Sequence, residues 1–133
     1  MAIYTASSFS KRTYQGDAGN LGVAVGEVTF GTGVGAVNAA IGDQINLFQL
    51  AAGMRINRVA IINAALGAGV TATVTSGAKV LVNAAGAATA GFVDQPLETY
   101  ETLVDDETVF LTVAGGVPTG KVTVHVYYVP AGL

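Results

Sequence analysis

The stretch KVTVHVYYV (121–129) has the clearest side-chain alternation in this sequence. One face of an extended chain over this stretch is apolar and carries Val122, Val124, Val126 and Tyr128. The opposite face is more polar and carries Thr123, His125 and Tyr127. Successive side chains of a β-strand point to opposite faces of its sheet. The alternation therefore predicts a strand with one buried face and one open face.

Similar short runs, rich in β-branched residues, recur between glycine-bearing turns. They are VAVGEVTF (23–30), VTATVT (70–75), AKVLVN (78–83) and VFLTV (109–113). Many short strands separated by turns are typical of sandwiches and barrels. With 133 residues, the chain has the usual length of one domain. The sequence therefore predicts an all-β fold, a single-domain antiparallel β-sandwich or jelly-roll.

The densely apolar region 44–64 allows either a helix or two strands. A helix would place Gly53 in its interior, at a cost of about 1 kcal/mol relative to alanine. Two strands, DQINLFQL (43–50) and RINRVAIIN (55–63), joined by a turn at 51–53, fit the same residues better. The glycine-rich stretch GTGVGAVNAAIG (31–42) and the run AAGAATAG (84–91) read as loops, and LETYETL (97–103) reads as an edge strand or irregular segment.

Residues 1–22 differ from the rest in being rich in Ser, Thr, Gly and Asn, with isolated larger side chains. We divide the chain into an N-terminal arm (1–22) and a β-sandwich domain (23–133). The arm is either a frayed chain end or a tether that docks on a neighbouring subunit. The side chains available for docking are Ile3, Tyr4, Phe9 and Tyr14, with the basic pair Lys11 and Arg12.

The composition excludes several classes of function. The chain has no cysteine and one histidine, so it contains no disulfide framework, no Cys-based zinc site and no site that needs two histidines. Its net charge is −3 with only six Lys and Arg, which argues against nucleic-acid binding. The first residues lack the apolar core of a signal peptide, and no apolar run approaches the ~20 residues that span a bilayer. We therefore expect a protein made in the cytoplasm, with no membrane partner.

Only 11% of the residues are charged, against about 25% in a typical globular domain. Charged residues are depleted where proteins contact one another. A surface with so little charge predicts that part of it is covered by a partner, and we expect a homo-oligomer.

No motif for chemistry survives inspection. The loop GTGVGA (31–36) lacks the later glycine of G-x-G-x-x-G, and no nucleophile turn of the G-x-S-x-G type occurs. His125 lies mid-strand and suits a polar contact at a subunit interface. The acidic residues are gathered mainly at one edge and turn, and they are Glu98, Glu101, Asp105, Asp106 and Glu107. They lack the D-x-D-x-D order of a calcium loop and read as a solvated edge. We expect no enzyme activity, no metal and no cofactor.

Two motifs carry a resemblance to a known family. The first, G-D-x-I-x-L-F-x-L-x-A-G-x-R, is formed by Gly42, Asp43, Ile45, Leu47, Phe48, Leu50, Ala52, Gly53 and Arg55. The second, G-x-[VL]-T-V-x-V-x-Y-V, is formed by Gly120, Val122, Thr123, Val124, Val126, Tyr128 and Val129. Over residues 42–133 the chain resembles the small capsid decoration, or cement, proteins of tailed bacteriophages.

The resemblance implies a virion protein that assembles as a trimer or dimer, binds the major capsid protein on the outer capsid surface and stabilises the shell. Candidate interface residues are Tyr4, Phe9, Lys11, Arg12, Tyr14, Arg55, Arg58, His125 and Tyr127. Two alternatives stay open: a phage tail or head-fibre component, and a carbohydrate-binding β-sandwich. The second would need an exposed aromatic platform from among Tyr4, Tyr14, Tyr100 and Tyr127.

Overall fold

The computed structural model describes residues 2–6, 21–104 and 106–130 of the chain. Within these ranges it contains nine β-strands and no helix. The first five are β1 (Ile3–Thr5), β2 (Gly22–Phe30), β3 (Gln44–Leu50), β4 (Met54–Asn63) and β5 (Thr71–Ser76). The others are β6 (Lys79–Gly86), β7 (Gly91–Glu101), β8 (Glu107–Ala114) and β9 (Gly120–Pro130).

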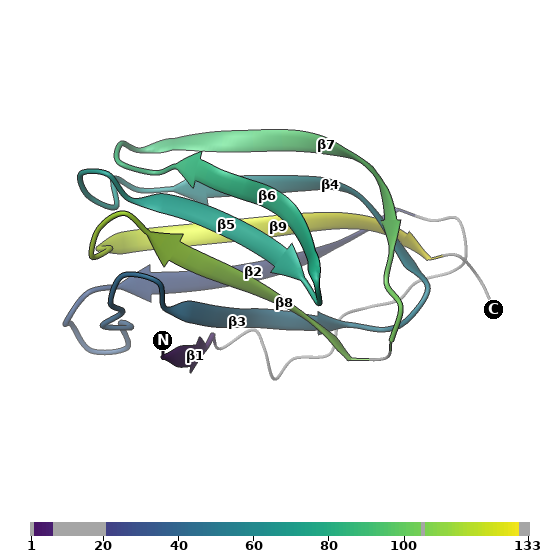
Figure 1. Ribbon diagram of the computed structural model, residues 1–133, viewed down its shortest axis with the longest axis horizontal. Coiled ribbons are helices and arrows are strands. Elements are labelled where there is room, and N and C mark those ends of the chain that lie inside the picture. The colour runs from purple at the N-terminus through teal and green to yellow at the C-terminus, as the bar shows by residue number, and fades with distance from the viewer. Residues whose placement is uncertain (1, 7–20, 105, 131–133) are drawn as a thin grey trace.

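The strands form two sheets that pack face to face (Figure 1). The five-stranded sheet has the order β1-β3-β8-β5-β6, and the four-stranded sheet has the order β2-β9-β4-β7. The predicted all-β sandwich is confirmed. Every pair of described strands is antiparallel except one: β1 runs parallel to β3. β1 and β3 are separated in sequence by β2 of the other sheet, so no hairpin forces them to be antiparallel.

Strand β9 lies in the middle of its sheet, between β2 and β4. Its alternation is as predicted: Val122, Val124 and Val126 are fully buried, and Tyr128 is 1% exposed. The residues between them are partly exposed on the outer face. The apolar side chains of β9 therefore fill the space between the two sheets.

Strand β2 approaches the other sheet closely. A Cβ atom at Gly26 would lie 2.7 Å from the Cβ of Leu47 on β3. Atoms in protein interiors are close-packed, and nothing larger than hydrogen fits at that distance. A glycine at this position lets β2 pack closely against β3.

The loops and turns follow the sequence prediction with one correction. Residues 31–42 form the expected loop, and β3 and β4 are joined by a turn in which Gly53 has φ +82°. The predicted loop at 84–91 is wrong at both ends, because β6 continues to Gly86 and β7 begins at Gly91. The small residues there are held by pairing with β5, where Ala72 lies opposite Ala85. β7 is the edge strand expected near residues 97–103.

The first residues of the predicted arm belong to the sandwich. Gln44 N donates to Ala2 O at 2.9 Å, and the Asp43 carboxylate accepts from Ala2 N and from Ala40 N, each at 2.8 Å. The hydrogen bonds from these two backbone N–H groups lower the pKa of the Asp43 carboxyl, and the bond from Ala2 contributes more than the bond from Ala40. Residues 7–20, with the remaining arm candidates, lie outside the described residues.

Replacement of Gly53 tests the β3–β4 turn. No atom lies within 4 Å of a Cβ built at this position, so a substitution there probes backbone strain without a clash. We expect Gly53→Val to lower the free energy of unfolding by about 1–2 kcal/mol, because an L-residue is strained at positive φ. Gly53→Asn is the control and should cost less, since Asn tolerates this conformation. Equal stabilities of the three proteins in urea denaturation would contradict the turn assignment.

Candidate functional site

Four predicted interface residues come together on the outer face of the four-stranded sheet. Arg55 and Arg58 lie on β4, and His125 and Tyr127 lie on the neighbouring strand β9. Arg58 is directly opposite Tyr127 in the strand register. We call this surface, formed by the outward side chains of β2, β9, β4 and β7, the charged face.

Arg58 is held in a fixed position on the charged face. Its Nε and Nη2 atoms donate to the two carboxylate oxygens of Asp94 on β7 at 2.6 and 2.9 Å. Its guanidinium carbon lies 6.0 Å from the centre of the Tyr127 ring. The Tyr127 and His125 rings are arranged edge to face, with 6.4 Å between their centres. Exposed ion pairs contribute only about 0–1 kcal/mol to stability, so the main effect of this cluster is to orient its side chains.

The rest of the charged face balances its charges and leaves apolar side chains open. Arg55 pairs with Glu101 at 3.1 Å, and Lys121 pairs with Glu27 at 3.0 Å. Large apolar side chains are exposed around these pairs, and they are Val23, Val25, Ile62 and Phe92. A charge-balanced surface with exposed apolar groups is suited to contact with another protein.

The outer face of the five-stranded sheet has a different chemistry. Its central strands β3, β8 and β5 present amide, hydroxyl and aromatic side chains and no charged ones. These side chains include Gln44, Asn46, Thr71, Thr73, Thr108, Phe110 and Thr112. We call this surface the threonine face. The two outer faces of the sandwich therefore differ in side-chain chemistry and suit different kinds of partner.

Tyr4, the remaining candidate among the described residues, does not lie on the charged face. Tyr4 lies on β1, packs against the core and donates from its hydroxyl to Asn38 O at 3.2 Å. Phe9, Lys11, Arg12 and Tyr14 lie outside the residues that the structure describes. Tyr100 also packs against the core, so of the described tyrosines proposed for a sugar platform only Tyr127 is on an open sheet face.

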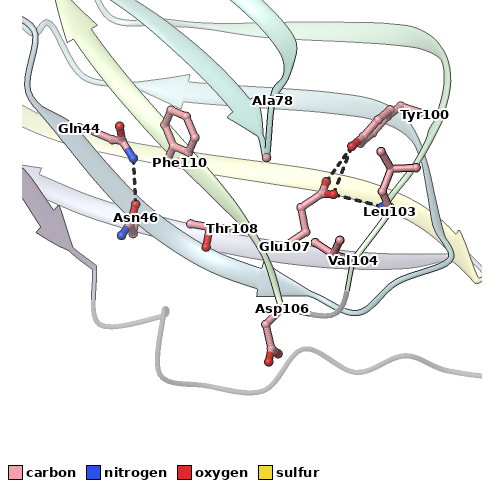
Figure 2. A pocket seen from close by; sticks show the side chains of 11 residues that line it. Gln44, Asn46, Ala78, Tyr100, Leu103, Val104, Asp106, Glu107, Thr108 and Phe110 are labelled. Carbon is pink, nitrogen blue, oxygen red and sulfur yellow. Dashed lines mark hydrogen bonds between the residues drawn. The ribbon is translucent and has the colours of Figure 1, made fainter.

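The acidic residues at the β7–β8 turn hold a feature that the sequence analysis missed. Glu107 was expected in a solvated edge, but it is only 5% exposed. Its carboxylate accepts hydrogen bonds from Tyr100 OH at 3.0 Å and Leu103 N at 3.1 Å (Figure 2). It also accepts a hydrogen bond from Ser76 Oγ at 2.5 Å. The alternation of β8 contains the signal, because Glu107 shares the inward parity of Val109.

The Glu107 carboxylate connects the end of β5, β7, the β7–β8 loop and β8. Both of its oxygens are engaged by donors. Burial, the hydrogen bond to Glu107 and the charge of that carboxylate raise the pKa of Tyr100 from 10.0 to about 12. The buried carboxylate and its three donors therefore hold these segments together. We call this hydrogen-bonded group the structural tie. In the described part of the chain, no three His, Asp or Glu side chains gather in a way that could hold a metal ion.

A shallow pocket of about 480 Å³ lies beside this tie (Figure 2). Its walls come from β3, β8, the β5–β6 turn and the β7–β8 loop. They include Asn46, Phe110, Ala78, Leu103 and Val104. The pocket offers an apolar surface, and its one buried acid, Glu107, is already saturated with hydrogen bonds.

The fold is shared with chains from bacteriophage capsids. One is from "Capsid of Ralstonia phage GP4", with TM-score 0.68, 18% identity, and coverage of 97% of this chain and 98% of that chain. Another is from "Cyanophage Pam1 capsid asymmetric unit", with TM-score 0.59, 23% identity and coverage of 90% and 91%. A third, from the "Acidic stable capsid structure of Helicobacter pylori bacteriophage KHP30", has TM-score 0.56, 19% identity and coverage of 87% and 92%.

At these identities the likeness is one of fold, and the resemblance seen in the sequence motifs agrees with it. No protein-family model matches the chain, and the search of curated proteins gives no match. No helix capable of crossing a membrane occurs in the ranges 2–6, 21–104 and 106–130.

The buried carboxylate gives a first test of this region. We expect Glu107→Gln to lower the free energy of unfolding by about 1–3 kcal/mol, because one carboxylate oxygen is replaced by a donor facing other donors. Glu98→Gln, on the exposed part of the same acidic stretch, is the matched control and should change stability by less than about 0.5 kcal/mol. Equal urea midpoints for the two variants would refute the structural tie.

Tyr100 gives a pH-dependent test. A folded-state pKa of about 12 against 10.0 means that folding favours the neutral phenol, so its stabilisation is complete below pH 10.0 and is lost as pH rises through about 12. The stability advantage of the native protein over Tyr100→Phe should therefore shrink across this interval. Denaturation of both proteins at several alkaline pH values measures it, and a constant difference would contradict the prediction.

Proposed function

We propose that this chain is a structural protein of a bacteriophage virion and that it decorates the outer surface of the capsid, acting as a cement protein. One observation carries the proposal: the sandwich matches a chain of the Ralstonia phage GP4 capsid over 97% of its own length and 98% of the other. The matched chain is therefore of similar size, and its fold is the same single sandwich. A small capsid chain of one domain fits a role on a shell better than that of a large shell subunit.

The partner we propose is the major capsid protein, bound through the charged face. Binding energy at protein interfaces concentrates in Arg, Tyr and Trp side chains near the centre of the contact. Arg58 and Tyr127 are of this type. Asp94 holds the Arg58 guanidinium by two hydrogen bonds, and the guanidinium lies over the Tyr127 ring. Side chains ordered in advance lose less entropy on binding. The exposed valines of β2 extend the contact on one side.

The proposal gives the chain a structural role, with no enzyme activity and no cofactor, in the virion after synthesis in the host cytoplasm. Weak contacts made by many copies gain strength when the copies are linked to one another. Stabilisation of a shell against internal pressure is consistent with that arrangement. A tail or head-fibre component is the alternative, and it would use the same face on a different partner.

Binding to shells that lack this protein tests the proposal directly. We expect the native protein to co-sediment with such shells, and Tyr127→Ala or Arg58→Ala to bind at least about tenfold more weakly, since loss of a central side chain costs upwards of about 1.4 kcal/mol. Thr112→Ala, on the threonine face, is the matched control and should bind normally.

Three outcomes would count against the proposal. No binding of the native protein to shells removes the capsid role, and binding to purified tails instead supports the alternative. Normal binding of both charged-face variants removes that face as the contact. A loss confined to Thr112→Ala assigns the contact to the opposite sheet.

A further inference from the structure

The described strands form two sheets with four edges, and three of these edges are closed to pairing with another strand. Natural proteins close sheet edges with short strands, charged residues, proline and bulges. β1 has only three residues. β7 contains Pro96, which has no N–H, together with the exposed carboxylate of Glu98. β6 has bulges in its pairing with β5, and Ala84 at φ +50°.

Among the residues that the structure describes, none pairs with the outer edge of β2 over residues 22–28. The strand has nine residues, no proline and no bulge in its pairing with β9. Its only charged side chain, Glu27, is paired with Lys121 of β9. Val23 and Val25 are 47% and 45% exposed. A long edge strand without bulges and with exposed apolar side chains is a template for pairing with a further strand.

The backbone shows which residues are available at this edge. Thr29 O accepts from Val37 N at 2.8 Å, and Gly31 N donates to Val37 O at 3.0 Å. The carbonyl of Thr29 thus points away from β9, and the alternation of a strand turns the backbone groups of Val23, Val25 and Glu27 the same way. Val37 covers the edge from Thr29 onwards. The open part therefore runs from 22 to 28, and its central residue is Val25.

We propose that two copies of this chain associate through this edge, with β2 antiparallel to β2 of the second copy and the two-fold axis at Val25. This register uses the whole open edge and opposes Val25 to itself and Val23 to Glu27. It therefore brings no two glutamates face to face, whereas a shift of the axis to Glu27 would do so. Each of the three outward residues then donates and accepts one hydrogen bond across the junction.

A second copy is the partner that suits this edge best. The open stretch is centred on Val25, its one charge is already neutralised, and its apolar side chains meet like side chains across a two-fold axis. Such a contact uses the same patch on both copies and consumes the open edge, so assembly stops at two and no fibre grows.

The pairing joins two four-stranded sheets into one continuous sheet. It also sets the two charged faces side by side on one surface, each with its cluster of Arg58, Tyr127 and His125. The proposal concerns the free protein and does not rest on the capsid role.

Single cysteines test the register, because the native chain has no cysteine. Opposed residues of an antiparallel pair have Cα atoms about 5.5 Å apart, within disulfide reach. We expect Val25→Cys to give a disulfide-linked dimer under mild oxidation. Val23→Cys alone should not, because the two copies of residue 23 would lie about four residues, or 13 Å, apart along the strands. The double variant Val23→Cys, Glu27→Cys should cross-link.

Val80→Cys is the matched control for exposure, since Val80 on β6 is 48% exposed against 45% for Val25. It should stay uncrosslinked. Equal cross-linking of Val25→Cys and Val80→Cys would overturn the proposal, as would cross-linking by Val23→Cys alone.

The mass of the protein in solution gives an independent readout. We expect the native protein to have the mass of a dimer by light scattering at micromolar concentration, and Val25→Lys to have half that mass, because two lysines would face each other at the axis. Val25→Thr keeps the β propensity and should remain dimeric. Far-ultraviolet circular dichroism checks that each variant is folded. A native monomer, a native trimer or a dimer that persists in folded Val25→Lys would refute the proposal.

Discussion

Strand β9 is the element on which the rest of the structure depends. It has a hydrogen-bonded neighbour on each side. Its inward side chains, from Val122 to Tyr128, are at most 1% exposed. Complete burial of a side chain of this size contributes about 1.5–3 kcal/mol. A slip of one residue would turn every one of these side chains to the outer face. The register of β9 is therefore strongly determined, and it determines where β2 and β4 lie.

The surface chemistry follows from that register. Because Val124 and Val126 must point inward, His125 and Tyr127 must point outward. The pairing with β4 then places Arg58 opposite Tyr127, and the pairing of β4 with β7 brings Asp94 within hydrogen-bond distance of the guanidinium. The cluster on the charged face is thus a consequence of how the core is packed.

The same packing decides the character of the free edge. Gly26 lets β2 lie against Leu47, and this close approach requires that no side chain separate the two strands. β2 also pairs with β9 over its whole length without a bulge. The other edges are closed by local features of their own sequences, such as Pro96 in β7. An edge that is both regular and unblocked is a site where assembly can begin.

Much of the fold was open to prediction because its signals are local. The alternation in 121–129 and the turn at Gly53 depend on residues adjacent in sequence, and the structure confirms both. The parallel pairing of β1 with β3 and the extension of β6 to Gly86 were not predicted, because each depends on a partner strand distant in sequence. The parity that buries Glu107 could have been read from β8, but its donors Ser76 and Tyr100 come from other strands. The sequence alone determined which faces are apolar and where the chain turns, since these follow from side-chain chemistry and backbone sterics. The tertiary structure alone decided which residues of separate strands meet, since strand order and register are set by packing across the whole core.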